Sequence, residues 1–345
     1  MSAKYISPEL FWIPAFFGLA FPYLFILNIF FLIFWLAQFK PATTFGIIAI
    51  ALSAPTAYRY IQFSVNLSKP TSRQLKVTSY NSMLFDLYNW SKNKESRSRI
   101  LSTFTDIDPD ILCLQEFYTS EDPGDFNNTD TVRDVLKMPY FHNEFTVTMR
   151  KNDHWGIATF SKYPIINQGK IIFNTNSNNI CIFTDIVVGE DTLRVYNLHL
   201  QSISFSKKDN KFLEDVISDH DAEDEVANSK NILRRLKRAF VKRTRQVDMV
   251  AAHIKTCPYK IILCGDFNDT AASYAYQELT ATLLDCFVEK GIGFGRTYAG
   301  KWPQFRIDYI LHDQRLDCSK YKRTEETVTD HFPITAWFDD INWSK

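Results

Sequence analysis

Carboxylates, amides and imidazoles occur repeatedly at the points where apolar runs of the sequence end. They stand at five places along the chain: Gln115-Glu116, Asn197 with His199, Asp266 with Asn268, Asp308, and Asp330-His331. Because strand ends on one edge of a sheet converge, side chains that are far apart in sequence can form one site there. Any one of them alone fits a hydrogen-bonded core residue or a turn residue equally well. Only the complete set indicates a site.

The chemistry of this set is complete for cleavage of a phosphoric ester. That reaction brings an anionic nucleophile to an anionic centre, and a hard divalent cation held by oxygen ligands neutralises the phosphate. Glu116 is the natural ligand for such a cation. Asp266 can orient or deprotonate the attacking water, and Asn268 can donate a hydrogen bond to an oxygen that gains charge. His331, held in one tautomer by Asp308, can stabilise phosphoryl oxygens or move a proton.

Short β-type runs alternate with helical stretches from Leu75 onward, and these elements must position the polar side chains. We expect helices over residues 100–107 and 231–254, and a short helix after Thr270. The expected strands are 75–81, 111–117, 154–165, 170–175, 180–188, 192–200, 260–268, 306–311 and 334–338. Elements in this order predict an α/β fold in which two packed sheets carry helices on the outside.

Seven short motifs contain these residues. They are SYN (79–81), LQE (114–116), GIATFSKYPI (156–165), NLHL (197–200), GDFN (265–268), RIDYIL (306–311) and TDHFPI (329–334). In content and order they resemble the successive motifs of the endonuclease/exonuclease/phosphatase superfamily, over roughly residues 75–338. Seven motifs in the correct order are very unlikely to arise by coincidence.

The resemblance implies a four-layered α/β/β/α sandwich of two mixed sheets and dependence on Mg²⁺ or Mn²⁺. It assigns residues by their place in the motifs: Asn81 and Glu116 at the metal with Asp330 beside it, Asp266 and Asn268 at the water and scissile phosphate, His199 on a phosphate oxygen, and Asp308 behind His331. Whether His331 acts as a base or as an electrostatic stabiliser stays open.

Two positions narrow the choice of branch. Abasic-site endonucleases of the superfamily carry asparagine where this chain has His199, whereas the deoxyribonuclease-like and sphingomyelinase-like branches carry histidine. Thr329 replaces the serine that is common before Asp-His and keeps its hydroxyl. We therefore expect a phosphodiesterase acting on nucleic acid or a phospholipid-type ester. The alternatives are an inositol- or sugar-phosphate phosphatase and a catalytically silent binding module on the membrane. No obligate protein partner is predicted.

The first 69 residues form a different segment. Between Glu9 and Lys40 the chain has no charged residue, and this apolar tract exceeds the roughly 20 residues that span a bilayer. A second uncharged tract follows from Pro41 to Tyr58. We expect a membrane anchor over residues 1–69, with transmembrane helices at about 10–38 and 42–58, followed by a catalytic domain over residues 70–345. The first span is too long for a straight helix, so a tilt or a break near Pro22 is expected.

The first tract fits a cleaved signal peptide or a buried core helix less well than a membrane span. A signal peptide would have a shorter apolar core and a small-residue cleavage site, and a buried core helix would be amphipathic. A membrane anchor followed by a catalytic domain resembles the arrangement of bacterial members of the superfamily. If the two tracts form a hairpin, the basic residues after the second tract lean toward a cytoplasmic catalytic domain. These residues are Arg59, Lys69, Arg73 and Lys76.

Charge alone does not define the substrate. The whole chain carries 39 basic and 39 acidic residues. The first 69 residues hold four basic and one acidic side chain, which leaves a net charge of −3 on the remainder. Such a domain lacks the overall basic character of a nonspecific nucleic-acid binder, although a local patch would suffice. One candidate patch is the basic run from Lys230 to Arg245, which suits phospholipid headgroups or a nucleic-acid backbone as well as an ordinary solvated helix face.

Three aromatic residues beside the motifs are candidates for substrate binding, namely Trp155, Tyr298 and Trp302. Stacking on a base is one use of such a ring, and ordinary packing is the commoner one. The six cysteines show no CxxC pair and indicate small core residues, with no structural zinc implied.

Overall fold

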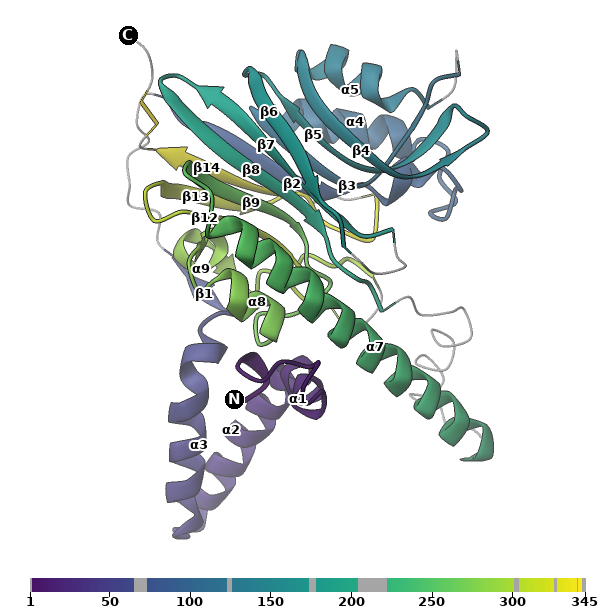
Figure 1. Ribbon diagram of the computed structural model, residues 1–345. Coiled ribbons are helices and arrows are strands. Elements are labelled where there is room, and N and C mark those ends of the chain that lie inside the picture. The colour runs from purple at the N-terminus through teal and green to yellow at the C-terminus, as the bar shows by residue number, and fades with distance from the viewer. Residues whose placement is uncertain are drawn as a thin grey trace.

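The computed structural model describes residues 2–64, 73–122, 126–173, 178–203, 222–300, 304–325, 328–339 and 341–342. Two six-stranded sheets form its centre (Figure 1). The first sheet has the order β13-β14-β2-β3-β5-β4. Its strands are β2 (Leu75–Asn81), β3 (Ile111–Ser120), β4 (Tyr140–Met149), β5 (Asp153–Ser161), β13 (Asp317–Arg323) and β14 (Ile334–Asp339).

The second sheet has the order β10-β12-β9-β8-β7-β6. Its strands are β6 (Ile165–Ile171), β7 (Ile180–Val188), β8 (Asp191–His199), β9 (Lys260–Asp266), β10 (Leu284–Asp285) and β12 (Asp308–His312). A separate pair joins β1 (Gln62–Phe63) to β11 (Ile292–Gly293). In each large sheet one neighbouring pair is parallel, β2 with β3 and β8 with β9, and the other pairs are antiparallel. The predicted α/β class with two mixed sheets is confirmed.

Helices cover both outer faces of the sheets. In the described part of the chain after residue 73, the helices are η2 (Met83–Asp86), α4 (Ser96–Ile107), α5 (Asn128–Leu136), α7 (Ala222–Ile254), α8 (Tyr274–Leu279) and α9 (Cys286–Lys290). On the first sheet, Ile100 and Phe104 of α4 pack with Leu112 of β3. On the second sheet, Val247 of α7 packs with Leu263 of β9. Because a third buried cluster lies between the sheets, the domain has helix, sheet, sheet and helix layers.

Local sequence signals account for where these helices begin and end. The side chain of Asn127 accepts a hydrogen bond from the backbone N–H of Asp130 and caps α5, and Ser273 caps α8 in the same way. Helix α4 ends at Ile107, and its C-cap Asp108 adopts a left-handed conformation at φ 49° before Pro109. This is the Asp-Pro break that the sequence predicts.

Some predicted boundaries are wrong. The run 154–165 is not one strand, because β5 ends at Ser161 and the chain crosses to the second sheet, where β6 begins at Ile165. Of the predicted strand 170–175, residues 170–171 are the end of β6, and residues 174–175 lie outside the described residues. Strands β4 and β13 and helix α5 were not predicted, and α7 starts nine residues before the predicted helix at 231.

The N-terminal segment contains η1 (Ser2–Lys4), α1 (Ile13–Leu19), α2 (Phe21–Ala37) and α3 (Ala42–Ala57). Helices α2 and α3 project from the sandwich side by side (Figure 1). A Cβ atom at Gly46 of α3 would lie 3.1 Å from Cδ1 of Leu32, so glycine allows the close approach of the two helices. Within the described ranges, no helix taken singly has the length and apolar character of a bilayer span. Helices α1 and α2 have the required length and apolar character only as a pair, and the pair is bent by 71°.

The break between α1 and α2 lies at Ala20, and Pro22 stands in the first turn of α2. The first expected span, over residues 10–38, is therefore two helices, and the break lies two residues before Pro22, where a break or a tilt was expected. The second expected span, 42–58, corresponds to α3, which has 16 residues.

Candidate active site

The two parallel strand pairs end at the same place in the sandwich. Asn81 is the last residue of β2, His199 is the last of β8, and Asp266 is the last of β9. Asp308 begins β12 and pairs with Asp266 in the antiparallel ladder. The Nδ2 atom of Asn81 donates a hydrogen bond to Oδ2 of Asp266 at 3.1 Å, which joins the first sheet to the second. The sequence-based expectation that these strand ends converge is therefore correct.

Asp266 lies at the centre of the group and is 1% exposed. Its Oδ2 atom lies 3.7 Å from Nε2 of His199 and 3.7 Å from Nε2 of His331. Its Oδ1 accepts the backbone N–H of Asn268 at 2.7 Å. Burial, followed by the neighbouring Asp308 carboxylate, raises the pKa of Asp266, and the two histidines partly offset this effect. A carboxylate in this setting holds a proton more readily than one in water.

His331 and Asp308 form a buried pair. Nδ1 of His331 lies 2.9 Å from Oδ2 and 3.1 Å from Oδ1 of Asp308. Burial opposes a charged imidazole, but the carboxylates of Asp308 and Asp266 outweigh it and raise the pKa of His331 well above its ordinary value. Thr329 Oγ1 accepts the backbone N–H of His331 at 3.0 Å, which gives a positional role to the threonine that replaces the usual serine.

Glu116 has an unusual backbone conformation. The β3–β5 register shifts between Leu114 and Phe117, and Glu116 within this bulge has φ 46°. Its side chain is 36% exposed, and Oε1 lies 3.8 Å from Nε2 of His199. Asn268 also adopts a left-handed conformation, at φ 52°. Strained backbone of this kind is concentrated at functional sites, and here it turns Glu116 toward His199.

Asp330 and Tyr298 belong to the same electrostatic environment. Burial raises the pKa of Asp330, His331 lowers it, and Glu116 and Asp266 raise it further. Burial together with Asp330, Asp266 and Glu116 raises the pKa of Tyr298 to about 12. The Tyr298 ring also meets that of His331 edge to face, with centroids 5.5 Å apart.

The other two aromatic candidates do not gain the same support. The ring of Trp155 packs against Tyr118, with centroids 5.0 Å apart, as expected for a packing residue. Trp302 lies outside the described residues.

The donor set fits a hard divalent cation. Four carboxylates (Glu116, Asp266, Asp308 and Asp330) and the side-chain amide of Asn81 meet two histidines, so oxygen donors dominate. The side-chain amide of Asn268 donates to the Leu200 carbonyl at 3.0 Å. Ligand atoms of Asp266, Asp308 and His331 lie within 4.8 Å of one another. Because Asp308 and His331 already contact each other, the more available oxygens are those of Glu116 and Asp330, whereas Oδ1 of Asn81 also accepts the backbone N–H of Met83 at 3.1 Å. Among the described residues, the buried Nε2 of His199 has no hydrogen-bond partner, which leaves it for a bound group.

Three supporting residues had no predicted role. Gln115 Nε2 donates to Asn197 Oδ1 at 2.7 Å across the interior between the sheets, and both side chains are fully buried. Thr297 Oγ1 accepts the backbone N–H groups of Ile307 and Asp308, which fixes the start of β12. The strand-end positions of Gln115 and Asn197 were a signal in the sequence for this pair. Thr297 belongs to no motif, so no sequence signal pointed to it.

Comparisons with known proteins give a consistent result. The model of the Endonuclease/Exonuclease/phosphatase family matches residues 79–331, and a domain of unknown function matches residues 1–60. No curated protein matches the chain.

Similar solved structures include three with different ligands or activities in their names. D. rerio TDP2 complexed with a single-strand DNA product is 16% identical, with 78% of this chain and 100% of that chain covered and a TM-score of 0.53. The mannosyl-6-phosphatase of Bacteroides thetaiotaomicron VPI-5482 is 16% identical, with 77% and 99% covered and a TM-score of 0.53. Sphingomyelinase C from Streptomyces griseocarneus is 19% identical, with 77% and 99% covered and a TM-score of 0.50.

These likenesses show a shared fold and leave the substrate open. The family match, in contrast, extends over more than half of the sequence and includes every candidate site residue from Asn81 to His331. The chain therefore belongs to the endonuclease/exonuclease/phosphatase family, whose members are hydrolases that act on phosphoric ester bonds.

Proposed function

We propose that the protein is a membrane-anchored, divalent-metal-dependent phosphodiesterase. The observation that carries this proposal is the position of Asp266, which contacts Asn81 of one sheet and faces His199 and His331 at 3.7 Å. A buried carboxylate between two imidazoles, beside further carboxylates, suits the hydrolysis of an anionic ester.

Asn81, Glu116 and Asp330 are the residues proposed to hold Mg²⁺ or Mn²⁺. A cation bound there would neutralise the phosphate and stabilise the leaving oxygen. Asp266 orients the attacking water, and its own position is fixed by the backbone N–H of Asn268. His199 presents its unpaired Nε2 to a phosphate oxygen. His331, held by Asp308, presents Nε2 to the same region and stabilises negative charge or transfers a proton there.

Helices α2 and α3 are the proposed membrane anchor, with the catalytic domain on the cytoplasmic side. Large apolar side chains on both helices are exposed, among them Phe30 at 64%, Phe34 at 55%, Phe45 at 75% and Leu52 at 64%. Exposed apolar surface of this extent is typical of a segment that contacts lipid.

The proposed anchor contacts segments that adjoin the site residues in the sequence. This proximity favours a phospholipid-type ester over nucleic acid as the substrate. At the end of α3, Arg59 donates hydrogen bonds to the Ala271 carbonyl and the Gln277 side chain. Arg306, two residues before Asp308, donates to the Arg59 carbonyl at 3.0 Å. The segment after Asp266 and the residue Arg306 before Asp308 are thus held against the base of the proposed anchor, which would bring lipid headgroups close to the site.

The test uses the full chain in detergent with a soluble phosphodiester such as bis(p-nitrophenyl) phosphate. We expect turnover with Mg²⁺ or Mn²⁺, loss of turnover with a chelator, and loss in Asp266→Ala and His331→Ala. Asp317→Asn is the matched control, because Asp317 is exposed at the start of β13. Equal turnover in all variants would overturn the enzymatic proposal, and metal binding without turnover would favour a silent binding module.

A panel of sphingomyelin, DNA, RNA, inositol phosphates and sugar phosphates then separates the substrate classes. Exclusive cleavage of phosphate monoesters would favour the alternative of an inositol- or sugar-phosphate phosphatase.

A further inference from the structure

One face of α7 concentrates positive charge that the proposed chemistry does not use. Between residues 226 and 247 the helix carries eight basic side chains and no acidic one. The exposed ones are Lys230, Arg234, Lys237, Arg238 and Arg245. At 3.6 residues per turn, these five positions fall within an arc of roughly 100°. They therefore form a basic stripe along one side of the helix, and we refer to these five residues as the basic stripe.

A different face of α7 packs against the N-terminal segment. Leu236 and Phe240 form a buried cluster with Phe16 of α1, and the rings of Phe16 and Phe240 meet edge to face at 5.2 Å. Two residues of the basic stripe also contact this segment. Lys237 Nζ lies 4.9 Å from the centroid of the Trp12 ring, and Arg245 donates to Oε1 of Glu9. Helix α1 is therefore fixed to α7 and turns away from α2 at the 71° bend.

We propose that the basic stripe of α7 and the adjoining α1 form a platform that docks on an anionic phospholipid surface. The N-terminal half of α7 extends beyond the sheets on the side from which α2 and α3 project (Figure 1). Basic clusters beside a membrane-inserted segment attract anionic headgroups, at about 1 kcal/mol for each Lys or Arg near the surface, or about fivefold in affinity. The inference rests on the proposed insertion of α2 and α3.

Apolar side chains near the basic stripe favour lipid over nucleic acid as the partner. Leu233 of α7 is 50% exposed, and Phe11 and Phe17 of the N-terminal segment are 49% and 59% exposed. Basic and apolar side chains together are typical of helices that lie in the interface of a bilayer. A nucleic-acid backbone would leave these apolar side chains in water.

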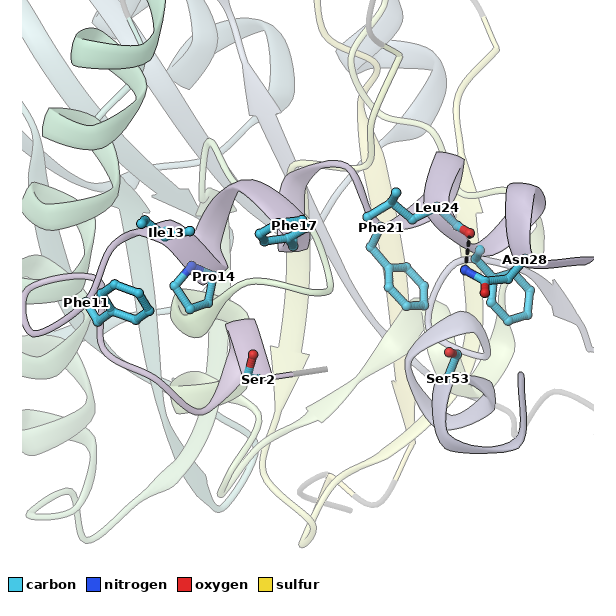
Figure 2. Close-up of a pocket in the computed structure, with 10 residues that line it drawn as sticks. Ser2, Phe11, Ile13, Pro14, Phe17, Phe21, Leu24, Asn28 and Ser53 are labelled. Atoms are coloured by element: carbon cyan, nitrogen blue, oxygen red, sulfur yellow. Dashed lines mark hydrogen bonds between the residues drawn. The ribbon is translucent and has the colours of Figure 1, made fainter. Parts of the chain in front are cut away.

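A groove between α1, α2 and α3 gives independent support. It has a volume of about 360 Å³ and is lined mainly by apolar side chains, including Phe11, Phe17 and Phe21 (Figure 2). Two of its polar side chains are bonded within their own helices, since Asn28 donates to the Leu24 carbonyl and Ser53 to the Ala49 carbonyl. A mainly apolar groove suits acyl chains, and its occupation by lipid would bring α1 to the level of the bilayer.

The platform is also connected to the active site. Arg243 of α7 is 1% exposed, and its Nε lies 3.0 Å from Oδ2 of Asp269. It also donates to the Gln201 carbonyl at 2.9 Å. Asp269 follows Asn268, and Gln201 lies two residues after His199. Docking of α7 on a membrane would therefore hold both site segments at the lipid surface.

The experiment uses the full chain reconstituted in vesicles of phosphatidylcholine alone or of phosphatidylcholine with phosphatidylserine. Amide hydrogen exchange of residues 229–245 is measured in both, and in the combined variant Lys230→Gln, Arg234→Gln, Arg238→Gln. We expect exchange in this segment to slow by about tenfold or more on the anionic vesicles, and the variant to lose that difference. The control variant Arg99→Gln, Arg150→Gln, Lys151→Gln removes three exposed charges from α4 and the β4–β5 turn, and it should behave like the parent.

Two results would overturn the proposal. One is equal exchange on both kinds of vesicle. The other is a combination of two observations: a single-stranded oligonucleotide slows the exchange of residues 229–245 on phosphatidylcholine vesicles, and phosphatidylserine does not slow it. Turnover of the soluble diester shows that each variant is folded and tests the enzymatic proposal separately. Extraction at alkaline pH tests insertion separately, because an inserted protein stays with the vesicles whereas a protein held only by surface charge is released.

Discussion

The Nδ1 atom of His331 lies 2.9 Å from Oδ2 of Asp308, and both side chains are buried. This contact places the proton of a neutral imidazole on Nδ1 and leaves Nε2 facing Asp266 at 3.7 Å. Asp308 in turn is fixed by its place in the ladder opposite Asp266. The orientation of His331 therefore depends on Asp308, and its charge depends on Asp308 together with Asp266.

Asp308→Asn should lower kcat by about a hundredfold or more, within the range of about 10² to 10⁴ that a positioned acid or base contributes. Asp308 raises the pKa of His331, so its removal should move the charged form of the histidine to lower pH. The rate on a soluble diester is measured against pH. We expect the alkaline limb of the profile to move to lower pH, with a smaller change in KM.

Asp317→Asn provides the comparison, since it removes an exposed carboxylate of the same kind without touching the histidine. If Asp308→Asn lowered the rate and left the pH profile in place, Asp308 would have a structural role only.

Glu116→Gln should weaken the binding of Mn²⁺ or Mg²⁺. Loss of a group that merely supports a metal ligand weakens a site by about tenfold to a hundredfold, so loss of a ligand oxygen should weaken it by at least about tenfold. Calorimetric titration of the full chain measures this directly. Glu121→Gln is the matched control, because Glu121 follows the same strand and contacts His154 instead. Unchanged affinity in Glu116→Gln would remove Glu116 from the metal site.

The hydrogen bond between Gln115 and Asn197 should contribute to stability. Each side chain is fully buried, and removal of one leaves the other without this partner. We expect Gln115→Met and Asn197→Ala each to lower the free energy of unfolding by about 2 kcal/mol. The double variant should lose less than the sum of the two, because the shared bond is lost only once. Urea unfolding of the three variants measures this, and strictly additive losses would show that the two residues act independently.

Much of the domain could be predicted because its central strands are short apolar runs that end in polar residues. Residues 75–81 were predicted as a strand and form β2, and the predicted strand 260–268 contains β9. Both sit in a sheet interior, so their burial appears directly as sequence pattern. The convergence of His199 and Asp266 followed from their positions at strand ends, whereas Asn81 was placed beside them by the resemblance to the family. The roles assigned to them stay predictions.

The parts that could not be predicted depend on contacts distant in sequence. Strand β4 has an edge position and mostly part-exposed side chains, so its apolar pattern is weak. The crossing between Ser161 and Ile165 is invisible as periodicity, because both sides of the turn continue as strand. The bend at Ala20 was expected near Pro22, but the packing of α1 on α7 gave no local signal. Thr297 supports Asp308 from a loop that belongs to no motif.

His142 should make the folded state less stable in mild acid. The side chain is buried, and its Nδ1 lies 3.0 Å from the Thr184 hydroxyl. Burial lowers the pKa of His142 below its ordinary value of 6.5, although Glu144 partly opposes this effect. Near pH 6.5 the unfolded chain therefore takes up a proton that the folded chain does not take up. The free energy of unfolding consequently falls as the pH falls through this range.

His142→Asn keeps an amide near the position of Nδ1 and cannot titrate there. We expect the difference in unfolding free energy between about pH 7 and about pH 5 to be smaller in this variant than in the parent chain, as measured by urea unfolding at both values. Equal differences would mean that His142 takes up its proton without unfolding, and that the acid sensitivity arises elsewhere in the domain.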